Sequence, residues 1–289
     1  MGVPHLNSLI LSQVPDAAIK THLSSLSGQK VAIDTSIFMY RYKERECLLE
    51  NMYNLVNLFK KHNIVACFIF DGKPPEEKSA VIETRREARY KAYDELVKCE
   101  EILAHEVLSS NERRALEARI AILKAKSTRI TQSDVSSVKD LLTAMGVVWV
   151  EACGEADGLC AKLASKHYVN ACVSDDMDMF VYGCPIVWRH LSLLQETVVV
   201  YNTKKICEGL KLTLEQLKEI CVASGTDYST KDDDKVNLLN TMKLFRRYSR
   251  HKTHQPFFEW LDEHTKYIDN MCMLYSNLGL FDTRYVYLN

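Results

Sequence analysis

The stretch IVACFIFDG, residues 64–72, is an almost unbroken apolar run that ends on an aspartate and a glycine. KVAID (30–34) has the same form, and VVWVEA (147–152) and VNACVSDD (169–176) also run apolar and then turn acidic. Such continuous apolarity over few residues is typical of strands buried on both faces of a parallel sheet. Because helical patterns such as residues 46–62 separate these runs, the sequence predicts an α/β fold with a mainly parallel central sheet.

Three further stretches complete the predicted organisation. IVWRHL and ETVVVY (186–201) predict a hairpin at the edge of the sheet. Residues 76–130 contain no glycine or proline and mix Arg, Lys and Glu with Ala and Leu, which predicts long helices carried as an insertion. A break is expected in LSSNER (108–113), where Ser or Asn caps the next helix. From about residue 204 the chain is again expected to be helical.

Composition excludes several classes of protein. The 289 residues carry 37 Lys and Arg against 38 Asp and Glu, so the net charge of −1 excludes a globally basic nucleic-acid coat. A polyanion would have to bind through a local basic patch. The ten cysteines are scattered without a CxxC pair, which favours free thiols in a reducing compartment, nucleus or cytoplasm. No apolar run approaches the ~18 residues of a membrane span, so we expect an intracellular protein with no membrane partner.

The acidic residues are the most informative feature, because seven of them stand where a strand or helix has just ended. Ligands bind beyond the carboxyl ends of strands in open parallel sheets, so at least six of these acids are expected to converge. A single aspartate at a strand end is more often a cap or turn former, and for Asp157 alone capping is the favoured interpretation. Helix capping does not explain why all seven acids stand where a strand or helix has just ended. The seven are Asp34, Asp71, Glu155, Asp157, Asp176, Asp178 and Asp227.

Such a cluster predicts a metal centre. Carboxylates packed together repel one another by several kcal/mol unless cations neutralise them. Ligation by oxygen alone, without Cys or His, suits Mg²⁺ or Mn²⁺ rather than zinc. Two such ions about 4 Å apart are the usual apparatus for hydrolysing a phosphodiester, because one activates the attacking water and the other stabilises the leaving oxygen. The pattern therefore predicts a nuclease with two Mg²⁺ ions, for which Mn²⁺ substitutes.

Five blocks of the sequence resemble the flap endonuclease family of structure-specific 5′ nucleases. They are VAIDTSIFMY (31–40), FDGKPPEEKS (70–79), GEADGLCAKLA (154–164), SDDMDMFVYG (174–183) and SGTDY (224–228). Their order and spacing match the family along most of residues 1–228. The resemblance implies a PIN-like nuclease core over residues 1–228, in which the insertion at 76–130 is a helical arch. Residues 229–289 would be a helical C-terminal extension of the same domain.

The resemblance also implies roles for individual residues. The seven acids match the family's metal-site acids, whereas Asp175 replaces a common Glu and is expected to lie outside the site. Lys78 and Arg85 match basic residues that face the scissile phosphate from the first arch helix. They are seven residues apart, close to two turns, so one helix face presents both. Without the family match, ordinary surface cations would be the favoured interpretation.

Two further positions match nucleic-acid contacts of the family. Tyr40 matches an aromatic residue that stacks on a base near the cleavage point, and its alternative is a half-buried core tyrosine. Gly2 matches a terminal residue that lies near the active site.

The chain departs from the family pattern beyond its last matching aspartate. The family usually has a glycine-rich hairpin there that grips duplex backbone, but residues 229–240 contain no glycine and three adjacent acids. Backbone amides approach phosphate most closely at glycine, and acids repel it, so a weakened duplex grip is expected. Arg246, Arg247 and Arg250 are expected to supply backbone contacts instead. A solvated basic helix face is an equally favoured alternative.

The C-terminal residues contain no Q-x-x-apolar-x-x-aromatic-aromatic motif for binding a sliding clamp, so no clamp partner is expected. We expect a monomer. The compact form and altered hairpin fit a divergent or viral relative, and a viral member would work at the site of viral replication.

Three functions compete. The leading hypothesis is a 5′-flap endonuclease with 5′–3′ exonuclease activity, which cuts branched or flapped DNA in replication, repair or recombination. The second is an RNA-directed nuclease of the same fold, of the viral type that degrades messenger RNA. The third is a non-catalytic relative that binds branched DNA, which predicts missing ligands, yet every family acid has a carboxylate counterpart here.

Overall fold

The computed structural model describes residues 2–75, 78–106, 108–226, 236–251, 254–268 and 270–286, apart from the side chains of residues 80 and 285. The described strands are β1 (Ala18–His22), β2 (Lys30–Asp34), β3 (Val65–Phe70), β4 (Val148–Glu151), β5 (Ala171–Val173), β6 (Ile186–Ser192) and β7 (Thr197–Asn202). The described α-helices are α1 (Leu6–Gln13), α2 (Thr35–Glu44), α3 (Leu48–Lys61), α4 (Ser79–His105), α5 (Ser110–Ser127), α6 (Gln132–Ala144), α7 (Ala156–Ser165), α8 (Asp178–Val181), α9 (Thr203–Leu210), α10 (Leu214–Ser224), α11 (Leu238–Arg250), α12 (Phe257–His264) and α13 (Met271–Leu280).

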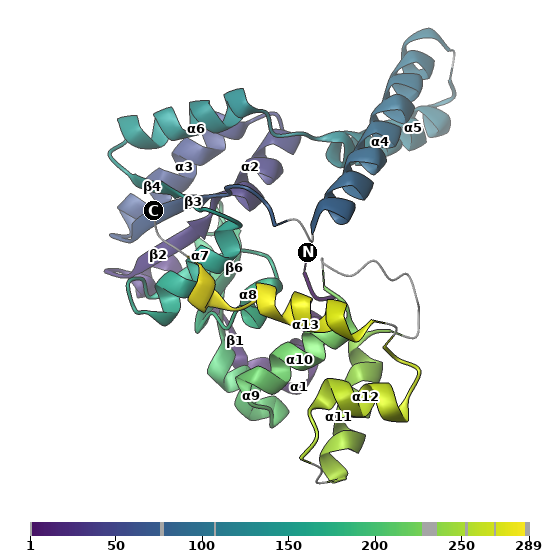
Figure 1. The fold of residues 1–289 in the computed structure, drawn as a ribbon. Helices are drawn as coiled ribbons and strands as arrows, with labels where there is room; N and C mark the ends of the chain where they lie inside the picture. The colour runs from purple at the N-terminus through teal and green to yellow at the C-terminus, as the bar shows by residue number, and fades with distance from the viewer. Residues whose placement is uncertain are drawn as a thin grey trace.

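The described strands form one sheet in the order β1-β7-β6-β5-β2-β3-β4 (Figure 1). Strands β6, β5, β2, β3 and β4 run parallel, with Val31 of β2 opposite Ala171 of β5 and Ala66 of β3. The predicted α/β fold with a mainly parallel sheet is therefore confirmed. The predicted hairpin is β6–β7, but it does not form the edge, because β1 pairs antiparallel with β7 outside it. β1 was not predicted because AIKTH has no apolar run and none of its residues is buried.

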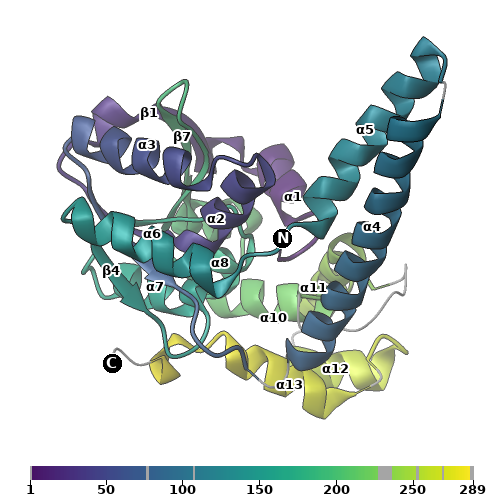
Figure 2. The ribbon, with the colours of Figure 1, turned by 90° about the horizontal axis from the view of Figure 1, so that it is seen from above.

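Helices cover both faces of the sheet. Alternate residues of each central strand point to opposite faces, so Val31 and Ile33 of β2 pack on one side and Ala32 packs on the other. The first side is covered by α2, α3 and α6, and the second by α1, α7, α8, α9 and α10 (Figures 1 and 2). The sheet is held between these two buried cores, which fixes the positions of the carboxyl ends of its strands.

A pair of long helices projects from this body (Figure 2). We call α4 and α5 together the arch, and they pack along each other through a small core of their own that includes Ala92, Leu96 and Ile120. The break expected at 108–113 is present. Ser109 caps α5 through a reciprocal capping box, in which its hydroxyl accepts from Glu112 N and Glu112 Oε2 accepts from Ser109 N at 3.0 Å.

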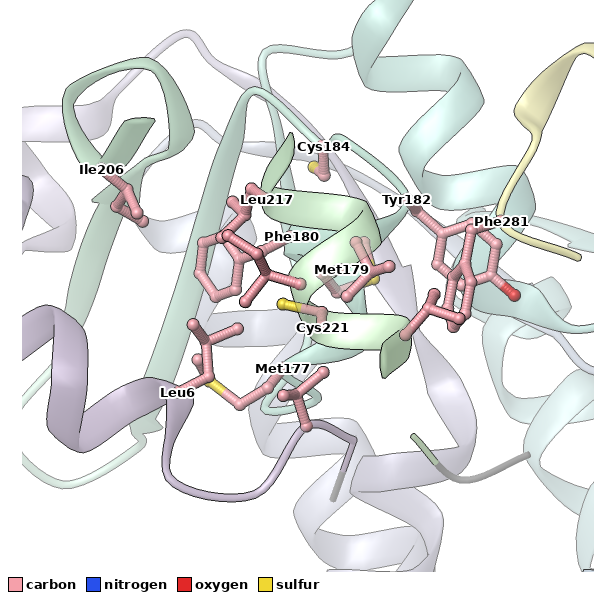
Figure 3. Close-up of a cluster of buried hydrophobic side chains, with 14 of the residues drawn as sticks. Leu6, Met177, Met179, Phe180, Tyr182, Cys184, Ile206, Leu217, Cys221 and Phe281 are labelled. Carbon is pink, nitrogen blue, oxygen red and sulfur yellow. The ribbon is translucent and has the colours of Figure 1, made fainter. Parts of the chain in front are cut away.

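The segment after β5 is anchored from beneath. Met177, Met179 and Phe180 are buried in the core that also holds Leu217 and Cys221 of α10 (Figure 3). Apolar and acidic residues alternate in this turn. Burial of Met177 and Met179 in the core therefore turns the side chains of Asp176 and Asp178 away from that core.

The C-terminal helices extend the same core. α11 and α13 pack against α10. Phe245, Trp260 and Phe281 belong to the hydrophobic core on the face of the sheet that α1, α7 and α10 cover. Within the described ranges, no helix combines the length and apolar character needed to cross a bilayer.

Candidate metal centre

Four neighbouring parallel strands deliver acidic residues to one edge of the sheet. In the order β5-β2-β3-β4, Asp176 follows β5 by three residues, Asp34 ends β2 and Asp71 directly follows β3. After β4, Glu155 is the N-cap of α7 and Asp157 lies in its first turn. The edge at which the sequence predicted convergence is therefore the edge at which these five acids lie.

A close approach of two loops brings the acids after β3 and β4 together. Gly72 N donates to Gly154 O at 2.7 Å, and a side chain at Gly72 would overlap the carbonyl oxygen of Ala152. This contact needs a glycine. It holds Asp71 at the start of α7, where Asp71 Oδ1 accepts from Ala156 N at 2.8 Å. A carboxylate is stabilised there by the positive end of the helix dipole.

Asp34 lies at the centre of the cluster. It is 5% exposed, and Ser174 Oγ donates to its Oδ2 at 3.0 Å. Burial raises the pKa of Asp34 to about 8, and the charges of Asp71 and Asp176 act in the same direction against the bond from Ser174. In the absence of a cation the site therefore favours a proton on this carboxyl group.

Asp157 has the same electrostatic signature. Burial raises its pKa well above the ordinary value, and the charges of Asp34, Asp176 and Asp71 add to the shift. Within the described part of the chain, Asp157 Oδ1 is buried and has no hydrogen-bond partner. The capping interpretation of Asp157 is wrong, since the N-cap of α7 is Glu155 and no side-chain cap bond is made. A buried carboxylate oxygen without a hydrogen-bond donor is a position suited to a cation.

Asp176 and Asp178 lie on the remaining side of the acidic cluster, next to the first described residues of the chain. Both are 5% exposed, and Asp178 N donates to Asp176 Oδ1 at 3.0 Å. Gly2, with φ of 76°, lies directly against them: a Cβ there would overlap Asp176 Oδ1 and come within 2.5 Å of Asp178 Oδ1. The structure thus brings Gly2 to the acids, where the sequence predicted it.

The donor set fits Mg²⁺ or Mn²⁺, since it consists of carboxylate oxygens, several of them buried. Among the described residues, which do not include Asp227, no three acidic, histidine or cysteine side chains lie closely enough together to hold an ion. Lys78 Nζ is ion-paired with Glu155 Oε1. Carboxylates that share a site repel one another unless cations neutralise them.

The arch begins at this edge. Lys78 is the N-cap of α4 and its side chain is 15% exposed, so its pairing with Glu155 places it beside the acids. Arg85 lies seven residues further along α4 and is exposed. Tyr40, on α2, is 42% exposed, so it is not the half-buried core tyrosine of the alternative.

The other predicted residues lie apart from the acids or outside the described ranges. Asp227 and most of residues 229–240 fall outside the described residues. Arg246, Arg247 and Arg250 are exposed on α11, and the Arg247 guanidinium lies 5.7 Å from the ring centroid of Trp260.

A buried polar network behind Asp176 was missed by the sequence analysis. Arg189 of β6, 6% exposed, donates from Nη2 to the carbonyl of Asp175 at 2.8 Å and from Nη1 to Asn7 Oδ1 at 2.9 Å. Asp175 is also ion-paired with Arg41 and accepts from His190 N at 2.6 Å. Arg189 thus ties α1, and through it the Gly2 segment, to the turn that carries Asp176. Asp175 faces this network, as expected of a residue outside the site.

Comparison with known protein families decides the relationship. The XPG N-terminal domain model matches residues 1–92, and the XPG I-region model matches residues 146–227, together more than half of the chain. The chain belongs to the Rad2-type flap endonuclease family. The two matched regions contain all seven predicted acids, with Asp227 as the last residue of the second match, as well as Lys78 and Arg85. The unmatched interval between them covers most of the arch.

Individual relatives agree with this assignment. Flap endonuclease 1 of Naegleria gruberi is 30% identical over 247 residues, which are 79% of this chain and 61% of the relative, so this family member spans less than two thirds of that protein. Among solved structures, human GEN1 bound to Holliday junction DNA superposes with a TM-score of 0.66 at 18% identity, covering 100% of this chain and 68% of that one. Flap endonuclease-1 from Methanococcus jannaschii gives 0.61 at 23% identity, covering 94% and 84%. At these identities the structures show a shared fold.

Proposed function

We propose that this chain is a structure-specific 5′ nuclease that hydrolyses phosphodiester bonds of 5′-flapped or branched DNA with the help of two divalent ions. The observation that carries the proposal is the convergence of acids from four adjacent strand ends, of which Asp34 and Asp176 are buried, with raised pKa values at Asp34 and Asp157. A purely structural cluster would leave no buried carboxylate oxygen without a donor, whereas Asp157 Oδ1 is buried and has none among the described residues. Membership of the flap endonuclease family and the DNA bound in the human GEN1 structure support DNA as the substrate.

The acidic residues at this edge of the sheet would differ in how directly they bind the ions. Asp34, Asp71, Glu155, Asp157 and Asp176 would hold the ions directly or through one water, and Asp178 and Asp227 would lie further out. When bound, divalent ions at such a site activate water and stabilise the leaving oxygen of the phosphodiester. Burial of the carboxylates strengthens their hold on cations, because water screens them poorly there.

The arch would supply positive charge beside the acids. Lys78, ion-paired with Glu155, already stands at the edge of the site. Arg85, two turns along α4, would face the same strand. Negative charge increases on the phosphate oxygens as the bond breaks, so cations placed there lower the barrier more than they tighten binding.

Two surfaces would bind the nucleic acid around the reaction. Tyr40 follows Asp34 on α2 and is 42% exposed, which suits stacking on a base next to the scissile phosphate. Arg246, Arg247 and Arg250 on α11 would contact duplex backbone, and these contacts would weaken with salt. Monomeric action is part of the proposal and is checked by light scattering of the same preparation.

The test is a panel of end-labelled substrates at fixed salt: 5′-flap, gapped, nicked, single-stranded and duplex DNA, with RNA counterparts of the flap and the single strand. The proposal expects Mg²⁺-dependent cleavage of the DNA flap within a nucleotide or so of the branch, faster than cleavage of unbranched single strands. Equal cutting of unbranched strands would overturn structure specificity. Faster cleavage of the RNA members would replace DNA by RNA as the substrate.

A further inference from the structure

Two histidines and a glutamate from three separate elements meet away from the acidic edge. His22 is the last residue of β1, His62 follows α3 as its C-cap, and Glu196 lies in the turn between β6 and β7. His62 also stands just before β3, so it lies toward the amino end of a strand whose carboxyl end delivers Asp71. Figure 2 shows β1, β7 and α3 together on the side of the molecule away from the arch.

The donor atoms of the three side chains point toward one another. His62 Nε2 lies 2.8 Å from Glu196 Oε2, and His22 Nε2 lies 4.0 Å from the same oxygen. The two imidazole rings stand edge to face, with their centroids 5.4 Å apart. The side chain of His62 is 8% exposed and that of His22 is 47% exposed, so the cluster reaches from the interior to the surface.

The backbone and charges around Glu196 hold its side chain in this position. Leu23 N donates to Glu196 O at 2.9 Å, which ties the residue after β1 to the β6–β7 turn. Lys61 Nζ donates to Glu196 Oε1 at 2.5 Å, so Oε2 is the oxygen that faces the histidines. The bonds from Lys61 and His62 lower the pKa of Glu196, which therefore stays ionised at neutral pH.

This geometry is close to that of a transition-metal site. Zinc binds imidazole nitrogens and carboxylate oxygens at about 2.0–2.2 Å, usually as a tetrahedron. Two imidazoles bound to such an ion through Nε2 have ring centroids about 5 Å apart, and their ligand atoms are about 3.3 Å apart. The ring separation of His22 and His62 already agrees with this value. His22 lies too far from Glu196 for the three described side chains to hold an ion, and an inward movement of its exposed ring by about 1 Å closes the set.

Ser24 controls which nitrogen of His22 faces the cluster. Ser24 Oγ lies 2.8 Å from His22 Nδ1, and Ser24 N donates to the same nitrogen at 3.2 Å. A histidine that binds a metal donates its other ring N–H to a neighbouring acceptor. The Ser24 hydroxyl is such an acceptor when the longer bond from Ser24 N is given up. His22 then presents an unprotonated Nε2 to the ion.

We propose that His22, His62 and Glu196 form a binding site for one Zn²⁺ ion. Glu196 also lines a surface groove of about 520 Å³ with Asn57 and Leu58, which gives the ion a path of entry and a water for its fourth position. Imidazole ligands suit zinc, whereas carboxylates and water suit magnesium, so this site differs in kind from the acidic edge. An ion here would join the ends of β1 and α3 to the β6–β7 turn and would stabilise the folded chain.

The test counts bound zinc by equilibrium dialysis of the full chain in excess Mg²⁺, and measures Tm with and without Zn²⁺. The proteins compared are wild type, His22→Gln, His62→Gln and the control His105→Gln, whose histidine is exposed in the last turn of α4. Cys153→Ser and Cys272→Ser are present in all of them, because these exposed thiols also bind zinc. Zinc held at the acidic edge contributes equally to all four proteins.

Wild type and His105→Gln should each retain one zinc that the ligand variants bind at least about tenfold more weakly. Zinc should raise the Tm of wild type and of the control, and not that of His22→Gln. Ser24→Ala should weaken zinc binding about tenfold, with partial rescue by Ser24→Thr, because only the hydroxyl acts on the ligand.

Equal zinc content and affinity in wild type and His22→Gln would overturn the proposal, because the ion would then be held elsewhere. Wild type that binds no zinc, with the ion in excess over the protein, would also overturn it. His62 is buried, so the deciding variants are His22→Gln and Ser24→Ala, whose altered side chains lie nearer the surface. Neither readout depends on cleavage, so the outcome is separate from that of the nuclease function.

Discussion

Replacing Asp34 by asparagine should stabilise the protein when no divalent ion is bound. The pKa of Asp34 is raised to about 8 in the folded protein, against an ordinary value of 3.8. Between these values the folded chain holds a proton that the unfolded chain has lost, so the free energy of unfolding falls as pH rises. At pH 7 the accumulated cost is up to about 4 kcal/mol. Asparagine removes the titration and still accepts the bond from Ser174, but it keeps a buried polar group, so we expect a net gain of about 2 kcal/mol.

The assay is thermal unfolding in EDTA between pH 5 and pH 8.5. For a chain of this size the gain corresponds to a rise in Tm of about 5 °C at pH 7. The gain shrinks toward pH 5, because the folded wild type is already protonated and the cost of protonating the carboxylate of the unfolded chain falls. With excess Mg²⁺ the order should reverse, because the wild type gains stability from the bound ion and the variant loses a ligand.

The control is Asp175→Asn, one residue from the site. Burial alone would raise the pKa of Asp175, but the bond from His190 N and the charge of Arg41 outweigh it and lower the pKa. Its ionised form therefore stabilises the fold, and that stability is lost as pH falls. Asp175→Asn should lower Tm at pH 7 where Asp34→Asn raises it. A fall in Tm for Asp34→Asn in EDTA would refute the electrostatic account of the site.

Three further predictions concern cleavage and ion binding. Lys78→Ala should slow single-turnover flap cleavage by about 10²- to 10³-fold while flap affinity changes only a few-fold. Arg113→Ala, at the start of α5, is the control and should mainly reduce salt-sensitive binding. Equal behaviour of the two variants would remove the catalytic role of Lys78. Gly2→Ala should lower Mg²⁺ affinity at least tenfold with little change in Tm, as measured by calorimetry, since the added methyl group would overlap Asp176. Arg189→Met should raise the Mg²⁺ concentration for half-maximal cleavage several-fold, with partial rescue by Arg189→Lys; a fall in Tm alone would make Arg189 structural.

Much of this arrangement can be predicted from the sequence, because strands buried on both faces of a parallel sheet are continuous apolar runs. The runs 64–72 and 30–34 identify strands whose ends must share an edge, so the convergence of Asp34 and Asp71 follows from topology. The exposed helices of the arch are equally clear, since 76–130 contains no glycine or proline, and the cap at Ser109 lies where the sequence placed a break.

The features that sequence did not reveal depend on contacts between distant residues. β1 has no buried residue, so its only signal is pairing with β7. Arg189 resembles any charged residue on a strand, and its bonds to Asn7 and Asp175 exist only once α1 and β6 are packed together. The ion pair of Lys78 with Glu155 joins residues far apart in the sequence.

Single-turnover cleavage of a 5′-flap DNA by wild type and by Asp176→Asn, in Mg²⁺, tests the central claim most directly. Flap affinity is measured in parallel by anisotropy. The account predicts that Asp176→Asn binds the flap at least as tightly as wild type, because repulsion of phosphate falls, and loses nearly all cleavage, because a ligand charge is lost. Near-normal cleavage by Asp176→Asn at saturating Mg²⁺ would contradict the assignment of these acids to a metal-dependent nuclease site.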